Sequence, residues 1–114
     1  MNLIFIMFRI FTTDEFDRDY DKLDNSDKDR VKKIFNQLRN QGDNVGKGLR
    51  ISILREKKFD GKRIYFLVYN NYSVVLSLAI SGKKAQQATI NRILLNIDHY
   101  QNYVVEELKK RGLA

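Results

Sequence analysis

The sequence lacks cysteine, proline and tryptophan, and its 114 residues include one histidine, His99. The absence of cysteine excludes disulfides, thiolate nucleophiles and cysteine-ligated zinc. One histidine excludes a multi-histidine metal site within a single chain. No proline-rich or low-complexity stretch marks a linker, and the length fits one domain of common size. We therefore expect one domain over residues 1–114 that uses no metal and no other cofactor.

Long hydrophobic runs are also missing. The apolar stretch MNLIFIMF at the N-terminus is too short to span a bilayer, and it has neither a basic leader nor a small-residue cleavage site. We interpret residues 2–11 as a strand instead of a signal peptide, with Met7 as an alternative start. The expectation is a cytoplasmic protein with no membrane partner.

Positive charge is present in excess, and it is concentrated in one segment. Residues 47–84 carry nine basic and two acidic side chains, whereas residues 1–46 carry eight and nine and residues 85–114 carry four and three. A focused basic segment favours a polyanionic partner, nucleic acid above all. The alternative is that these lysines and arginines solvate strand edges and prevent edge pairing.

Periodicity predicts the order strand, two helices, three strands, helix. Thr12 or Thr13 caps a helix that ends near Leu23, and Ser26 caps a second helix over 27–41. Strands are expected over 49–59, 62–69 and 72–80, because 60–61 and 70–71 hold residues that favour tight turns. One amphipathic helix should run from about 85 to 111. The prediction is an α+β fold, an antiparallel sheet with a helical hairpin on one face and a long C-terminal helix.

Alternation along the predicted strands separates two faces of the sheet. Over 62–69 one face is apolar, with Ile64, Phe66 and Val68, and the other holds Arg63, Tyr65, Leu67 and Tyr69. Over 72–80 the same rule places Val74, Leu76, Leu78 and Ile80 together. We expect the helices to cover the apolar face and the basic, tyrosine-bearing face to stay exposed.

An exposed face of this kind can bind RNA, since cations neutralise phosphates and aromatic rings stack on unpaired bases. The candidates are Arg50, Arg55, Lys57, Lys58, Lys62, Arg63, Tyr65, Lys83 and Lys84. Cleavage by the neighbouring 2′-hydroxyl needs a proton acceptor, cations for the phosphate and an acid, and it needs no metal. The same residues also suit an ordinary solvated hairpin tip.

Three stretches resemble the RelE/ParE toxin superfamily of bacterial and archaeal toxin–antitoxin modules. FRIFTTDEFDRDYDKL looks like its first strand and helix, and DGKRIYFLVYNNYSVVLSLAI looks like its central hairpin. SGKKAQQATINRILLNIDHY is similar to the basic stretch and helix that close many members, especially the HigB-like branch. Two family features are missing: ISIL stands where some members have paired lysines, and no C-terminal tyrosine lies near Thr89.

The resemblance implies a metal-independent, ribosome-dependent mRNA endonuclease silenced by a cognate antitoxin, with a homodimer as a further option. Arg63 matches the family's phosphate-contacting arginine, and Lys83 and Lys84 match its basic pair. The catalytic residues implied are Arg63, Arg55, Lys57 and Lys84; the RNA-binding residues are Arg50, Lys58, Lys62, Tyr65, Tyr69 and Lys83. The alternatives are a gyrase-inhibiting toxin of the same fold and a non-catalytic module that binds RNA or protein.

Overall fold

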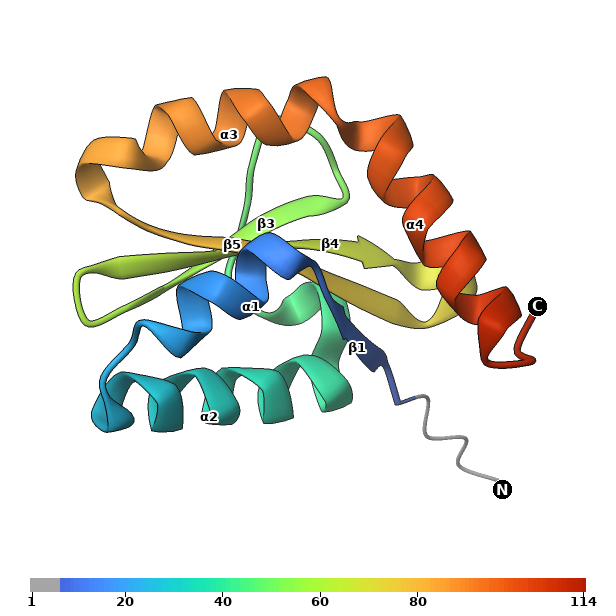
Figure 1. The fold of residues 1–114 in the computed structure, drawn as a ribbon, viewed down its shortest axis with the longest axis horizontal. Coiled ribbons are helices and arrows are strands. Elements are labelled where there is room, and N and C mark those ends of the chain that lie inside the picture. The colour runs from blue at the N-terminus through green and yellow to red at the C-terminus, as the bar shows by residue number, and fades with distance from the viewer. Residues whose placement is uncertain (1–6) are drawn as a thin grey trace.

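The computed structural model describes residues 7–114 (Figure 1). Its elements are β1 (Arg9–Thr12), α1 (Asp14–Asp21), α2 (Asn25–Gln41), β2 (Lys47–Gly48), β3 (Leu54–Phe59), β4 (Lys62–Tyr69), β5 (Val74–Gly82), α3 (Gln86–Leu95) and α4 (Ile97–Lys110). This order confirms the predicted α+β fold. The expected strand over 2–11 falls partly on residues 2–6, which lie outside the described part of the chain.

Within residues 7–114, five strands form one sheet in the order β1-β5-β4-β3-β2. All neighbours are antiparallel except β1, which pairs with β5 in parallel. The hairpin between β3 and β4 turns at Asp60 (φ 46°) and Gly61 (φ 72°). Positive φ at both positions is what this residue pair tolerates, so the tight turn was correctly predicted.

Side-chain caps mark the N-termini of α1 and α2. The Thr13 hydroxyl accepts a hydrogen bond from the Phe16 amide (3.1 Å) at the start of α1. For α2 the cap is Asp24, whose carboxylate accepts from the Asp27 amide (2.7 Å), so the expected cap at Ser26 is wrong. Aspartate and serine can each accept a hydrogen bond from a free amide of the first turn. With Asp24 as the cap, α2 begins two residues earlier than a cap at Ser26 would allow.

A β-bulge divides β5. Tyr65 is paired with Ala79, but Phe66 is paired with Ser77, so Leu78 is an extra residue on β5. Beyond it the alternation is reversed, which places Ile80 opposite Ile64 on the face toward α1 and α2. The expectation that Ile80 shares a face with Leu78 is therefore wrong.

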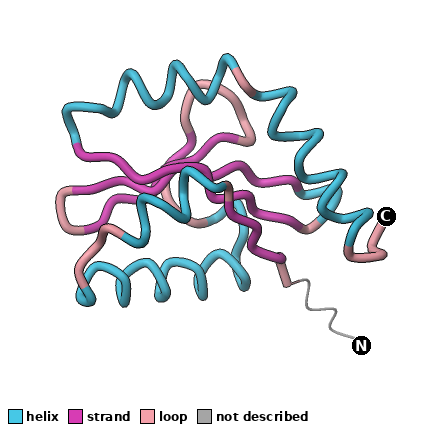
Figure 2. Tube along the Cα trace, viewed as in Figure 1, coloured by secondary structure: helices cyan, strands magenta, loops and turns pink. Residues whose placement is uncertain are grey.

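Helices cover both faces of the sheet, which is seen nearly edge-on between them in Figures 1 and 2. The layer of α1 and α2 buries the apolar stripe of Phe16, Val31, Ile34 and Leu38 against the sheet. The opposite layer of α3 and α4 buries Ile90, Ile93, Val104 and Leu108. The sheet face that was expected to be exposed is therefore buried, because the C-terminal helices cover it.

The C-terminal helical segment is divided at Asn96, where one continuous helix was expected. The Asn96 side chain donates to the Arg92 carbonyl (2.8 Å), a local bond that competes with helix continuation. Beyond the break, the Tyr103 hydroxyl donates to the Thr12 carbonyl (2.9 Å) and ties α4 to β1. No helix within residues 7–114 is long and apolar enough to cross a membrane.

Candidate functional site

A basic hollow of about 270 Å³ opens at the end of the sheet where β3 turns into β4. We call it the cationic hollow. Its lining consists of Lys58, Phe59, Asp60, Gly61, Lys62, Arg63 and Lys83. Four of these residues are cationic and one is acidic, so the local charge favours an anion.

Strand register brings these cations together. Lys58 is paired with Arg63 across β3 and β4, and Lys62 is paired with Gly82 across β4 and β5. Lys83 follows Gly82 directly, so it comes to the same end of the sheet. Four of the predicted site residues therefore converge: Lys58, Lys62, Arg63 and Lys83.

Lys62 forms an ion pair with a residue of α2. Its ammonium donates to the carboxylate of Asp27 at 2.7 Å, and Arg30 donates to the other oxygen of that carboxylate at 2.9 Å. The bond from Lys62 lowers the pKa of Asp27 below its ordinary value of 3.8, and the same bond raises the pKa of Lys62 above 10.5. Lys62 thus anchors the hairpin, and less of its charge is free for a ligand than was expected.

Arg63 is the innermost cation of the hollow. Only 8% of the residue is exposed, and its Nε has no hydrogen-bond partner among residues 7–114. The carboxylate of Glu56 lies 3.9 Å from that nitrogen, beyond hydrogen-bond distance. A buried donor without a hydrogen-bond partner is costly, so the position of this guanidinium calls for an explanation.

Glu56 and Gln86 belong to this site and were not predicted. Glu56 is 2% exposed, and both of its carboxylate oxygens accept from the Gln86 amide, at 3.3 and 3.0 Å. Gln86 is the first residue of α3, so the helix holds the carboxylate in place. The sequence carried one signal, since Glu56 is one of two acidic residues within the basic segment 47–84.

Tyr65 and Tyr69 are not available for base stacking, which corrects the prediction. Tyr65 is fully buried and its hydroxyl bonds with that of Ser81 (2.8 Å). Tyr69 is buried as well, and burial raises the pKa of its hydroxyl to about 12. Both rings pack in the core beneath α3 and α4 because that layer covers their face of the sheet.

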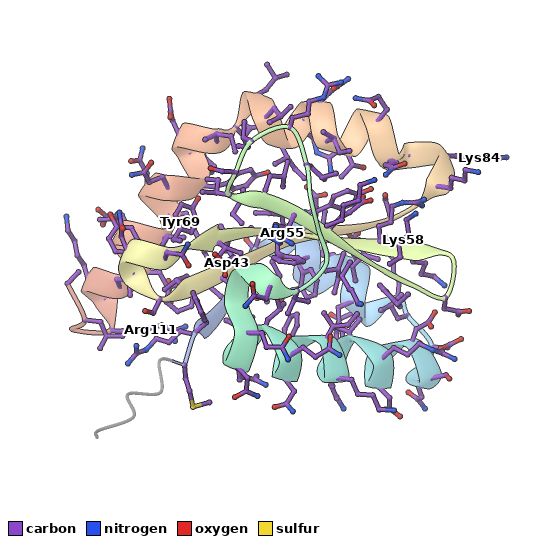
Figure 3. All side chains as sticks on the ribbon, turned by 180° about the vertical axis from the view of Figure 1, so that it is seen from behind. Asp43, Arg55, Lys58, Tyr69, Lys84 and Arg111 are labelled. Atoms are coloured by element: carbon purple, nitrogen blue, oxygen red, sulfur yellow. The ribbon has the colours of Figure 1, made fainter. Side chains whose placement is uncertain are left out.

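The remaining predicted cations lie outside the hollow. Arg55 donates to the carbonyls of Val45 (2.9 Å) and Gly46 (2.8 Å), which fixes the loop before β2. Lys57 is paired with Ile64, on the sheet face opposite to that of Arg63. Arg50 is exposed in the loop before β3. Lys84 points outward at the same end of the molecule as Lys58 (Figure 3). Arg55 and Lys57 therefore do not converge with Arg63.

The arrangement is suited to binding a phosphate. An ammonium from β3, another from the segment after β5 and a guanidinium at the base surround one hollow. Such groups stabilise negative charge on phosphate oxygens. Within residues 7–114, no cluster of three acidic or histidine side chains has the geometry to hold a metal ion.

The sequence matches no protein-family model, and no curated protein is significantly similar to it. Solved structures do share its fold. The RelBE2 toxin–antitoxin complex from Mycobacterium tuberculosis aligns with a TM-score of 0.60 at 20% identity, over 68% of this chain and 93% of that one. A double mutant of the free RelE toxin from Escherichia coli aligns with a TM-score of 0.64 at 14% identity, over 76% and 98%. The RelB–RelE complex from Methanococcus jannaschii aligns at 0.55 and 12%, over 69% and 96%. The chain therefore has the RelE fold that the resemblance predicted.

Proposed function

We propose that the chain is the toxin of a type II toxin–antitoxin module and that it binds and cleaves mRNA on the ribosome. The observation that carries the proposal is the cationic hollow, which Lys58, Lys83 and the largely buried Arg63 line together. A polynucleotide backbone supplies the phosphates that such a site binds. The RelE fold supports the toxin assignment, because structures that share it are RelE toxins, alone or with RelB antitoxins.

The chemistry that suits this hollow is attack by the ribose 2′-hydroxyl on the adjacent phosphorus. The nucleophile and the leaving group both belong to the RNA, so the protein needs to stabilise charge and move protons. Arg63, Lys58 and Lys83 line the hollow and can stabilise the charge on the phosphate oxygens. Lys58 and Lys83 are exposed, so they are the lysines best placed to exchange protons with the substrate.

The test is induced expression in a bacterial host, with growth followed and cleavage sites mapped on cellular mRNA. Wild-type protein should arrest growth and cut mRNA at defined positions. The double variant Lys58→Gln/Lys83→Gln should lose both effects, because two of the cations around the phosphate are gone. The matched control is Lys109→Gln/Lys110→Gln, which removes the same charge from the end of α4 and should remain toxic.

Two results would contradict the proposal. Growth arrest with intact mRNA would point to another target, and a DNA-supercoiling assay then tests inhibition of gyrase. Toxicity that persists in Lys58→Gln/Lys83→Gln would remove the hollow from the mechanism.

A second candidate is a module that binds RNA without cutting it. The burial of Tyr65 and Tyr69 favours it, since neither hydroxyl is free to act as an acid. This candidate predicts salt-sensitive RNA binding with no cleaved product from purified ribosomes and mRNA.

A further inference from the structure

Arg63 and Glu56 form an internal charge pair beneath the cationic hollow. Both side chains are more than nine-tenths buried, and the Arg63 Nε lies 3.9 Å from the Glu56 carboxylate. Among residues 7–114, Glu56 is the acidic residue that forms an ion pair with Arg63. Without this carboxylate, the buried guanidinium would be an uncompensated charge, which is costly in a protein interior.

The carboxylate is fixed by α3 and not by the arginine. Gln86 donates to both oxygens of Glu56, so its amide group occupies one edge of the carboxylate. Arg63 stands beside the pair without a direct hydrogen bond, and it reaches the lining of the hollow. Arg63 therefore lines the hollow while its charge is paired with a carboxylate that α3 holds in place.

We propose that Glu56 restrains RNA binding by neutralising Arg63. In the wild-type protein the exposed lysines around the hollow then supply most of the charge that attracts a phosphate, and Glu56 reduces the contribution of Arg63. Removal of the negative charge of Glu56, with its shape preserved, should convert Arg63 into one additional effective cation for a backbone phosphate. This inference rests on the proposed function, since the ligand is taken to be RNA.

The substitution Glu56→Gln tests the proposal, because glutamine still accepts a hydrogen bond from Gln86. Binding to a labelled single-stranded RNA is measured by fluorescence anisotropy across a series of salt concentrations. The slope of log K against log salt is negative, and neutralisation of one additional phosphate makes it steeper by about 0.7. The same change tightens binding about fivefold at 0.1 M salt. The control Glu106→Gln makes the same change in net charge on an exposed site of α4 and should leave the slope unchanged.

The double variant Glu56→Gln/Arg63→Gln locates the effect. It replaces the ion pair by two neutral amides, so it leaves no buried charge without a partner, and its folding is checked by urea unfolding. If the proposal holds, the increases in affinity and slope seen in Glu56→Gln disappear in the double variant.

Three outcomes would overturn the inference while the proposed function stands. One is RNA binding by the wild-type protein that Glu56→Gln leaves unchanged in both affinity and slope. Another is a gain that persists in Glu56→Gln/Arg63→Gln. The third is loss of mRNA cleavage in Glu56→Gln with unchanged binding, which would make Glu56 a participant in the reaction. RNA binding by none of the variants, with the wild-type protein folded, would instead refute the proposed function.

Discussion

Two buried tyrosines on β4 differ in whether their hydroxyl groups are hydrogen-bonded. Tyr65 and Tyr69 both lie in the core beneath α3 and α4. The hydroxyl of Tyr65 bonds with Ser81 at 2.8 Å, whereas that of Tyr69 has no hydrogen-bond partner in the described part of the chain. A buried polar group without a hydrogen bond lowers stability, so the two hydroxyls should contribute with opposite sign.

Removal of each hydroxyl tests this difference. Tyr65→Phe should lower the free energy of unfolding by about 1 kcal/mol, the net value of a hydrogen bond in a protein. Tyr69→Phe should leave the free energy of unfolding unchanged or raise it, because it removes only the desolvated group. Urea denaturation of the two variants and the wild-type protein gives both values. A destabilisation by Tyr69→Phe as large as that by Tyr65→Phe would contradict the assignment.

At the scale of elements, one carboxylate joins α2 to the hairpin of β3 and β4. Asp27 accepts from Lys62 on β4 and from Arg30 one turn along α2, and Asp60 and Asp24 lie in the same electrostatic neighbourhood. Because the bond from Lys62 lowers the pKa of Asp27, its stabilising effect is present above the ordinary value of 3.8. It is lost as the pH falls through the lowered pKa.

The raised pKa of Lys62 sets the highest pH at which its ion pair with Asp27 still contributes to stability. The contribution of Lys62 is complete below 10.5 and is lost as the pH rises through the raised value. Asp27→Asn should therefore reduce the free energy of unfolding most between about pH 4 and pH 10, and the difference from wild type should vanish in acid. Chemical denaturation at several pH values measures it, with the exposed neighbour Asp29→Asn as control. A difference that is independent of pH would show that the ion pair is not its cause.

The break between α3 and α4 gives two hydrophobic residues opposite environments within three positions. Ile93 is buried in the core, whereas Leu95 is 86% exposed beside the break. Ile93→Ala should cost about 2–5 kcal/mol of stability, the usual range for a large core residue. Leu95→Ala should stay within about 0.5 kcal/mol of wild type, as exposed substitutions do. Thermal or urea unfolding distinguishes these values, and similar costs at both positions would place Leu95 in an interface.

The sequence was sufficient for those elements whose signals are local. Asp60 and Gly61 favour a tight turn, and the run of aliphatic and aromatic residues over 62–69 is typical of a strand, so β4 was predicted with the bounds that the structure shows. Helix periodicity also predicted an amphipathic segment from about 85 to 111, and its apolar stripe includes the buried residues Ile90, Ile93, Val104 and Leu108. Periodicity does not show which surface the apolar side of a helix packs against. The prediction therefore missed that the C-terminal helices bury the sheet face of Tyr65 and Tyr69.

The candidate site was predictable only in part for the same reason. Charge segregation is visible in the sequence, and it identified Lys58, Lys62, Arg63 and Lys83. Whether a side chain near a strand end points outward depends on strand register and on the helices above, which are long-range properties. Glu56 was missed because its role depends on Arg63 across the hairpin and on Gln86 thirty positions later.

At the scale of the whole molecule, charge is distributed along its longest dimension, 45 Å against 30 and 26 Å. Lys58 and Lys84 lie at one end, and Arg111 lies at the other (Figure 3). Charges farther apart than about 10 Å are largely screened at 0.1 M salt. The basic residues of the two ends should therefore act independently on a bound polyanion.

Salt dependence measures this independence. Lys83→Gln/Lys84→Gln should reduce the slope of log K against log salt for single-stranded RNA by about 0.7 for each phosphate that the variant no longer neutralises. Lys109→Gln/Lys110→Gln removes equal charge at the far end and should leave the slope as it is in wild type. Equal reductions in both variants would indicate that net charge, and not the cationic hollow, determines RNA binding.

The extra residue in β5 affects more than the core. Because Leu78 is unmatched on β4, every side chain that follows it has the opposite parity to those before it. If β5 had no bulge and Leu78 were paired with Tyr65, Ile80 would lie under α3 and Ser81 against α2, so Tyr65 would lose its hydroxyl partner. Lys83 would emerge on the reverse side of the hairpin. One inserted position in a strand thus sets how many ammonium groups meet at the end of the sheet.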